Sequence, residues 1–254
     1  MKPLSVARDL QRRRARERTG LFIAEGVRCI EELLSSQLRV RSVIISPTLH
    51  ETERGASLDA AVRTAARDRG FELSEATELE LATAADTDAP QGIVAIAERP
   101  ERSFGGVGEH EIMLILDGIQ DPGNVGTILR TAEAFGVVAT VALPGTVDVW
   151  NPKVVRSAMG ALFSHNAFHA SVADTLSFLQ THTIPIWATS ADGEPVSRAS
   201  AGSGLAIVVG NEAGGVSADL IVAAARTVAI PIRGVESLNV AVATGILLYA
   251  ITTA

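Results

Sequence analysis

The second half of the chain alternates short apolar runs with amphipathic stretches, a pattern typical of strands and helices that follow one another. From residue 110 onward the pattern predicts six strands, at 112–116, 137–143, 167–170, 185–189, 205–209 and 228–232. It also predicts five helices, at 125–135, 152–162, 172–180, 217–225 and 240–251. Such alternation favours an α/β fold with a mostly parallel sheet, covered by helices on both faces.

The first 98 residues show a smaller version of the same pattern. Helices are expected at 5–18, 26–36 and 58–69, and strands at 21–24, 40–46, 71–73 and 92–98. Residues 99–109 combine proline, glycine and charged residues, which is typical of a linker. With 254 residues, 47% of them apolar, the chain can build two cores. We therefore expect two α/β domains, 1–98 and 110–254.

Charge is distributed unevenly along the chain. The net charge of −7 argues against a nucleic-acid partner, yet the first twenty residues hold seven Lys or Arg against only Asp9 and Glu17. Such a cluster can contact phosphates, although a solvated helix face is an equally good interpretation. The single Cys29 excludes an internal disulfide and suits a reducing compartment. We see neither a secretory signal nor a bilayer-spanning run, so we expect a cytoplasmic protein without a membrane partner.

The loop after the predicted strand 112–116 contains the sequence DPGNVG, followed by an arginine in the next helix. Proline and glycine force a turn there, and Asn124 is a natural helix cap. Arg130 stands near the start of an otherwise apolar helix, where the helix dipole disfavours a cation. The arginine is therefore expected to have a partner, which is either a ligand or one of Asp117 and Asp121 in an ion pair.

Two further loops follow predicted strands. The loop GNEAGG at 210–215 has neither a Walker lysine nor a GxGxxG fingerprint, but its glycines allow a flat ligand to approach the backbone. Glu212 could orient a ligand, accept a proton or cap the neighbouring turn, and Ser217 is a plausible helix cap. Ser237 and Asn239 precede the last helix, which both could cap. Parallel strands end at one sheet edge, so the three loops predict a binding cleft.

Other candidate residues carry weaker signals. Lys153 and Arg156 lie one turn apart on the predicted helix 152–162, so they face either phosphate or solvent. The five histidines are dispersed and none forms a metal-ligand spacing with Cys29. There is no GxSxG sequence that would support a Ser/His/Asp triad. We therefore expect no metal site.

Taken together, the three loop segments resemble the signature motifs of the SpoU (TrmH-type) branch of the SPOUT RNA methyltransferases. The matching stretches are DGIQDPGNVGTILRTAEAFG, VVGNEAGGVS and IPIRGVESLNVAVATGILL, in the family's order and spacing. The stretch LQRRRARERTGLFIAEGVRCIEELL resembles the family's substrate-binding domain, which is akin to the ribosomal protein L30e fold. One departure is Phe163-Ser-His-Asn166, where a leucine–proline pair is expected. We expect it to affect the dimer or RNA surface.

The resemblance implies a C-terminal SPOUT domain with a deep trefoil knot and an N-terminal L30e-like substrate-binding domain. It implies a homodimer that uses S-adenosylmethionine to methylate a ribose 2′-hydroxyl in ribosomal RNA or, failing that, transfer RNA. The catalytic residues implied are Asn124, Arg130, Glu212, Ser237 and Asn239. Those implied for the cofactor are Gly210, Asn211, Gly215, Ile230, Ile232 and Leu238. Those expected to bind RNA are Arg12, Arg13, Arg14, Arg16, Arg28, Lys153 and Arg156.

A guanidinium stays protonated, so we expect Arg130 to stabilise the developing alkoxide while an RNA phosphate or Glu212 accepts the proton. Family accounts that make the arginine itself the base remain open. Three alternatives share the fold: a catalytically silent RNA-binding or ribosome-assembly module, a base methyltransferase, and a drug-resistance enzyme acting on one ribosomal RNA ribose. A dinucleotide-dependent dehydrogenase is disfavoured because the fingerprint is missing.

Overall fold

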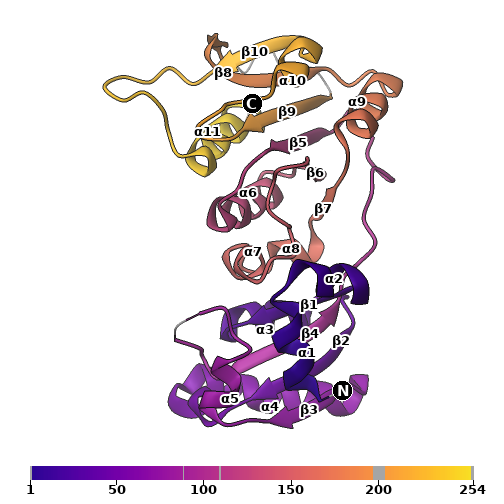
Figure 1. Cartoon of the computed structure of the whole chain (residues 1–254), viewed down its shortest axis with the longest axis vertical. Helices are drawn as coiled ribbons and strands as arrows, with labels where there is room; N and C mark the ends of the chain where they lie inside the picture. Colours follow the sequence, from indigo (N-terminus) through magenta and orange to yellow (C-terminus); the bar gives the residue numbers. More distant parts are fainter. Residues whose placement is uncertain (1, 88, 109, 197–203, 253–254) are drawn as a thin grey trace. The chain divides into compact units, whose positions relative to one another are not determined.

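The computed structural model describes residues 2–87, 89–108, 110–196 and 204–252 (Figure 1). The chain divides into two compact units. The first unit comprises residues 1–101 together with 150–164, and the second comprises 102–149 together with 165–254. Residues 150–164 thus group with the first unit, although they lie within the stretch that we expected to form the second domain.

A four-stranded sheet in the order β1-β4-β2-β3 forms the centre of the first unit. β4 runs antiparallel to both of its neighbours, whereas β2 and β3 are parallel. Ile23, Ile44 and Ile96 from the sheet pack against Ala7 and Leu10 of the first helix. The four predicted strands are confirmed, and their bounds are β1 Leu21–Glu25, β2 Val40–Ile45, β3 Glu72–Glu75 and β4 Ile93–Glu98.

The helices of the first unit differ from the prediction mainly at their ends. The helix predicted at 58–69 begins five residues earlier, because the Thr52 hydroxyl accepts a hydrogen bond from the Gly55 amide at 3.0 Å and caps it. Two short elements, η1 and α5, were not predicted. The helices are α1 Pro3–Leu10, α2 Arg13–Thr19, α3 Val27–Ser35, the 3₁₀ helix η1 Pro47–Glu51, α4 Glu53–Arg69, α5 Glu78–Ala82, α7 Pro152–Ser157 and α8 Ala161–Ser164.

The single helix predicted at 5–18 is wrong, because the chain breaks between α1 and α2. Arg16 is only 1% exposed. Its Nη1 donates hydrogen bonds to the carbonyl oxygens of Leu10 and Gln11, at 2.8 and 2.9 Å. The guanidinium thus satisfies carbonyl groups that the end of α1 leaves without intrahelical donors. Arg16 is therefore a structural residue, and its predicted role in RNA binding is corrected.

The helix predicted at 152–162 is likewise two helices, α7 and α8. Met159 and Gly160 separate them with φ angles of 51° and 92°, which a regular helix does not allow. The half-buried Arg156 of α7 forms an ion pair with Glu25 and lies 3.3 Å from Asp86. Its charge is thus neutralised within the first unit, which argues against the phosphate contact that we expected.

The second unit is built on a six-stranded sheet in the order β10-β8-β9-β5-β6-β7. Every neighbouring pair is parallel, so the predicted parallel sheet is confirmed. Strand β10 ends three residues before the predicted end, and β8 extends further than expected. The strands are β5 Ile112–Asp117, β6 Ala139–Ala142, β7 Asn166–His169, β8 Ile186–Pro195, β9 Leu205–Gly210 and β10 Arg226–Ala229.

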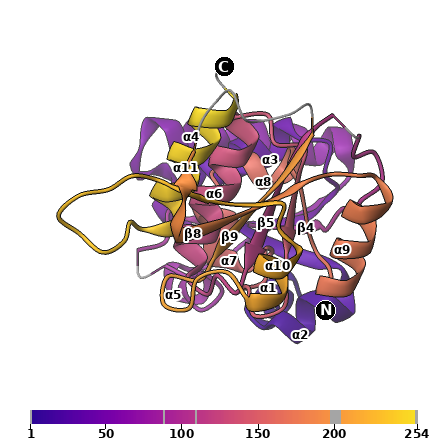
Figure 2. The same cartoon turned by 90° about the horizontal axis from the view of Figure 1, so that it is seen from above.

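Helices cover both faces of this sheet, as Figure 2 shows for α6 and α11 on one side and α9 and α10 on the other. Met113 and Val208 of the sheet share a core with Leu179 of α9 and Leu220 of α10. The helices are α6 Pro122–Ala134, α9 Val172–Thr181, α10 Ala218–Ala223 and α11 Val240–Thr252. None of the helices in the described ranges has the length and apolar character that a bilayer crossing requires. The trefoil knot stays a prediction.

The departure at 163–166 lies mostly in the interior. Phe163 packs near Phe22 in the first unit, with ring centroids 5.8 Å apart. His165 is buried in the second unit, where its ring nitrogens lie 2.7 Å from Thr140 Oγ1 and 3.1 Å from Glu133 Oε2. Burial lowers the pKa of His165, and the Glu133 carboxylate opposes that shift. These two side chains therefore contribute to packing rather than to a dimer or RNA surface.

Candidate functional site

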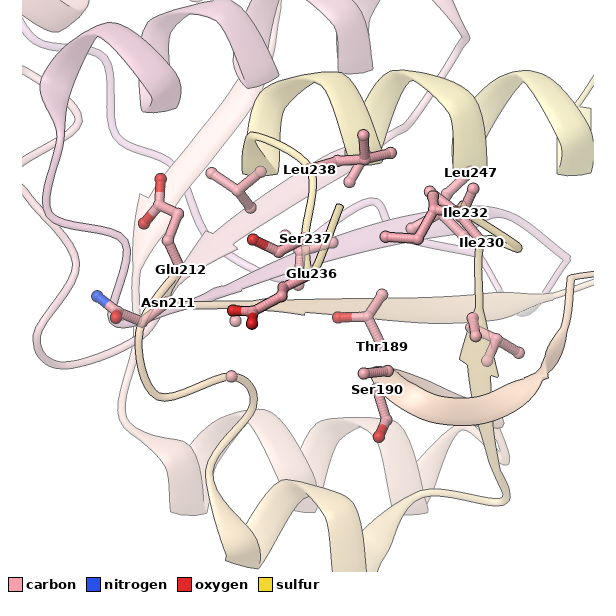
Figure 3. Close-up of a pocket in the computed structure, with 18 residues that line it drawn as sticks. Thr189, Ser190, Asn211, Glu212, Ile230, Ile232, Glu236, Ser237, Leu238 and Leu247 are labelled. Carbon is pink, nitrogen blue, oxygen red and sulfur yellow. The ribbon is translucent and has the colours of Figure 1, made fainter. Parts of the chain in front are cut away.

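A cavity of about 290 Å³ lies where β8, β9 and β10 meet the loops that follow them (Figure 3). This is the carboxyl edge of the parallel sheet, where open α/β sheets bind ligands. Eight residues proposed from sequence line it together, and they come from the two loops that follow β9 and β10. They are Gly210, Asn211, Glu212, Gly215, Ile230, Ile232, Ser237 and Leu238.

The cavity has a polar end and an apolar end. In Figure 3, Asn211, Glu212 and Ser237 lie toward one side, whereas Ile230 and Ile232 lie toward the other. Both isoleucines belong to the loop after β10, because that strand already stops at Ala229. The arrangement suits a ligand with one flat apolar part and one polar or charged part.

The loop 210–215 closes on itself through Asn211. The Asn211 Oδ1 accepts hydrogen bonds from the amides of Ala213 and Gly214, at 2.8 and 3.2 Å, and its Nδ2 donates to the Gly118 carbonyl at 2.9 Å. A Cβ atom on Gly210 would stand 2.2 Å from the carbonyl carbon of Gly215, so only glycine fits there. The Asn211 side chain therefore shapes the loop, a role that sequence reasoning missed.

A relay of side-chain amides connects all three loops at the polar end. Asn124 Nδ2 donates a hydrogen bond to Glu212 Oε1, and Asn239 Nδ2 donates to Asn124 Oδ1 at 3.0 Å. Asn239 Oδ1 accepts from the amides of Ala241 and Val242, at 3.0 and 3.3 Å, and so caps α11. The Glu212 carboxylate is thereby held in place by a chain that ends at a helix terminus.

The sequence suggested Asn124 as the N-cap of α6, but the structure shows that the N-cap is Asp121. Asp121 Oδ1 accepts a hydrogen bond from the Asn124 amide at 2.8 Å. The Asn124 side chain is consequently available for the relay. Similarly, Ser217 occupies the N-cap position of α10 without a side-chain capping bond, and its amide instead donates to Asp117 Oδ2 at 2.7 Å. Both aspartates thus hold backbone amides.

Arg130 lies on the exposed surface of α6 and is not among the residues that line the cavity. Within the described part of the chain, the structure shows no ion pair between Arg130 and an acidic residue. Six residues of α-helix correspond to about 9 Å along the axis and about 240° of rotation from Asn124. Its guanidinium can therefore act only on a group that is brought to this surface from outside.

The single cysteine of the chain lies on α3 of the first unit and does not line the cavity. Burial, reinforced by the Glu25 carboxylate, raises the pKa of the Cys29 thiol to about 12, so the thiol stays protonated and is a poor nucleophile. Within the described ranges, no three His, Cys, Asp or Glu side chains are placed to hold a metal ion. The residues that line the cavity or form hydrogen bonds beside it offer amide, carboxylate, hydroxyl and backbone groups.

Comparison with known families divides the chain much as its fold does. Residues 111–249 match the SpoU rRNA Methylase family, and residues 5–95 match the MRM3-like substrate binding domain. The first match contains the cavity, the amide relay and Arg130. The second match contains β1 to β3, the first half of β4 and the basic helix α2.

Two bacterial relatives match nearly the whole chain. The 23S rRNA (guanosine(2553)-2′-O)-methyltransferase RlmP of Bacillus subtilis is 31% identical over 244 residues, which cover 95% of this chain and 92% of the relative. A 23S rRNA (uridine(2479)-2′-O)-methyltransferase of Streptomyces viridochromogenes is 28% identical over 250 residues, covering 94% of this chain and 85% of the relative.

Solved structures agree with these relatives. The SpoU methyltransferase AviRb from Streptomyces viridochromogenes, in complex with AdoMet, superposes with a TM-score of 0.85 at 25% identity, covering 98% of this chain and 96% of its own. The AdoMet-bound rRNA methyltransferase from Sinorhizobium meliloti superposes with a TM-score of 0.84 at 26% identity, covering 98% and 94%.

The relay generates a prediction about Asn239. Asn239→Ser keeps a capping oxygen but loses the amide that donates to Asn124, whereas Asn239→Ala loses both. We expect the alanine variant to lower the free energy of unfolding by about 1 kcal/mol and the serine variant to stay within about 0.5 kcal/mol. Hydrogen exchange at residues 210–215 should be faster in both variants. Unchanged exchange in the serine variant would show that the relay does not order the loop.

Proposed function

The chain belongs to the SpoU rRNA Methylase family and is an AdoMet-dependent RNA 2′-O-methyltransferase, and from this premise we propose that it methylates a ribose of ribosomal RNA. The observation that carries the proposal is the amide relay, in which Asn124, Glu212 and Asn239 join three loops beside one cavity. The 23S rRNA substrates named for the two bacterial relatives favour ribosomal over transfer RNA.

The cavity fits S-adenosylmethionine in its polarity. Ile230, Ile232 and Leu238 supply apolar contacts suited to an adenine ring, while Gly210 and Gly215 bring backbone close to the ligand. Asn211 holds the loop in the required shape. When bound, the cofactor supplies a methyl group activated by the positive charge of its sulfonium. These residues are the ones that we propose to hold it.

The residues of the relay prepare the acceptor. A ribose 2′-hydroxyl is a weak nucleophile, so a base must take its proton as the new bond forms. Glu212 is a carboxylate at the polar end of the cavity, and Asn124 and Asn239 fix its orientation. We assign Glu212 or a phosphate of the bound RNA as the proton acceptor, and Ser237 as a further polar contact at that end.

Arg130 completes the site by electrostatics. Its guanidinium remains protonated and can stabilise the negative charge that develops on the ribose oxygen. Because it is exposed on α6, the RNA must bring the ribose to it from outside the cavity. The complete set of relay residues, Arg130 and cavity favours an active enzyme over a silent RNA-binding or ribosome-assembly module of the same fold.

An exposed apolar stripe on α11 supports the proposed homodimer. Val242, Ile246 and Tyr249 are spaced by four and three residues, so they share one helix face, and they are 53%, 40% and 62% exposed. A second copy of the chain would remove this apolar surface from water. Since α11 contacts α6, with Phe135 and Tyr249 rings 6.3 Å apart, the partner would also come near the helix that carries Arg130.

The first unit is proposed to bind RNA through its remaining exposed cations. Arg12, Arg14 and Arg18 project from around α2, whereas Arg13 pairs with Glu17 at 2.7 Å and contributes less net charge. The exposed Arg28 and Lys153 extend the set. With aromatic residues at only 4% of the chain, recognition by charge and shape is favoured over base stacking. A ribosomal RNA substrate and a single cysteine support the proposed cytoplasmic location.

Arg130→Ala tests the catalytic role. We expect methylation to fall by about 100-fold or more, because a preorganised charge near the oxyanion is lost, while cofactor affinity stays unchanged. Methylation is measured as the transfer of tritiated methyl groups to ribosomal RNA from cells that lack the gene. Cofactor affinity is measured by calorimetry. Arg130→Lys should retain part of the activity. Equal loss of methylation and cofactor binding would make the arginine structural.

Arg14→Ala and Arg16→Ala form a matched pair. The first should weaken RNA binding and reduce the slope of log affinity against log salt by about 1, leaving stability within about 0.5 kcal/mol. The second should lower the free energy of unfolding by about 1.5–3 kcal/mol, because charged hydrogen bonds to α1 are lost. Fluorescence anisotropy at several salt concentrations and urea denaturation distinguish them. An unchanged slope for Arg14→Ala would remove that residue from the RNA surface.

Ile246→Asp tests the dimer. A carboxylate in the centre of the α11 stripe should convert the dimer to a monomer, because burying it would require desolvation of an unpaired charge. Light scattering after size-exclusion chromatography gives the mass. Val222→Asp is the matched control, since Val222 is 86% exposed on α10, and its mass should not change. A monomeric unsubstituted protein would contradict the proposal.

A further inference from the structure

We propose that Glu236 faces the sulfonium of the bound cofactor and makes the cavity prefer S-adenosylmethionine over the demethylated product S-adenosylhomocysteine. This inference rests on the proposed function, because it assumes that the cavity of Figure 3 is the cofactor site. It adds a residue that determines ligand specificity and that lies just before the Ser237–Asn239 segment already assigned to the site.

Glu236 has a central position in the cavity. It belongs to the loop between β10 and α11 and is one of the lining residues. Figure 3 places its carboxylate between the polar end, marked by Asn211 and Glu212, and the hydroxyls of Thr189 and Ser190. The apolar side chains Ile230 and Ile232 lie on the far side. The carboxylate therefore stands near the middle of the cavity, between its apolar and polar parts.

The cavity carries a net negative charge. Its lining contains two carboxylates, Glu212 and Glu236, and no lysine, arginine or histidine. Glu212 accepts a hydrogen bond from Asn124. For Glu236, the described part of the chain shows neither a hydrogen bond nor an ion pair. A negatively charged cavity whose central carboxylate has no partner among the described residues favours a ligand with a positive charge at its centre.

The chemistry of the reaction turns this charge into specificity. Transfer breaks the bond between sulfur and the methyl carbon and forms a bond between that carbon and the ribose oxygen, while the hydroxyl proton goes to the base. The electron pair of the broken bond stays on sulfur, which becomes a neutral thioether. Glu236 therefore attracts the cofactor more strongly than the product, and the product leaves more readily.

The size of the effect follows from the distance between the charges. Opposite unit charges about 4 Å apart strengthen binding by about fivefold even at the dielectric constant of water, and by more where apolar walls exclude solvent. Glu236 is exposed, so screening keeps the effect near the lower bound. A competing role exists for the same side chain. If Glu236 held the ribose hydroxyls or the α-ammonium, which cofactor and product share, both ligands would lose affinity equally.

Glu236→Gln separates these roles by calorimetry on the protein without RNA. The glutamine keeps the shape of the side chain and removes its charge. We expect the affinity for S-adenosylmethionine to fall by about fivefold or more and the affinity for S-adenosylhomocysteine to stay within about twofold. The matched control is Asp219→Asn, which removes an exposed carboxylate from α10 outside the cavity and should change neither affinity.

Two results would overturn the assignment of Glu236. Equal losses for both ligands would assign it to a group that they share, and no loss for either would place it out of contact with the ligand. Failure of the proposed function gives a different result, because the unsubstituted protein would then bind neither ligand. Unchanged circular dichroism and melting temperature of the Glu236→Gln variant show that any loss reflects binding and not folding.

Discussion

One side-chain amide, that of Asn124, makes a single site out of three separate loops. It donates to the Glu212 carboxylate and accepts from Asn239, which in turn caps α11. Hydrogen bonds to charged groups are stronger than those between neutral groups. The bond from Asn124 to the Glu212 carboxylate is therefore expected to be stronger than the bond from Asn239 to Asn124. The three loops are therefore tied to the N-terminus of α11, a helix that is buried on one face and exposed on the other.

Two aspartates, Asp117 at the end of β5 and Asp121 in the loop that follows, leave the Asn124 side chain free to join the relay. Asp121 caps α6 and Asp117 binds the amide at the start of α10, so Asn124 is not needed for capping. Asn211 likewise closes its own loop with both ends of its amide. Short polar side chains thus satisfy the backbone, whereas the longer side chains of Glu212 and Glu236 line the cavity.

Arginines in this protein show how little residue type reveals about role. Arg14 and Arg16 stand two residues apart in one basic cluster, yet the first is exposed and the second is buried against the end of α1. Arg156 was expected to meet phosphate, but it pairs with the buried Glu25. A cation inside a protein must be paired, so the available partner, and not the local sequence, decides whether it can bind RNA.

The strands, the parallel sheet and the three loops at one sheet edge could be predicted from the sequence, because apolar periodicity and glycine-rich turns are local properties of the chain. The breaks in the predicted helices, the burial of Arg16 and the pairing of distant side chains could not be predicted, because they depend on tertiary contacts. Asn124 and Asn239 are 115 residues apart, and Glu25 and Arg156 are 131 apart. Contacts over such distances depend on how the whole chain packs, which no local pattern encodes.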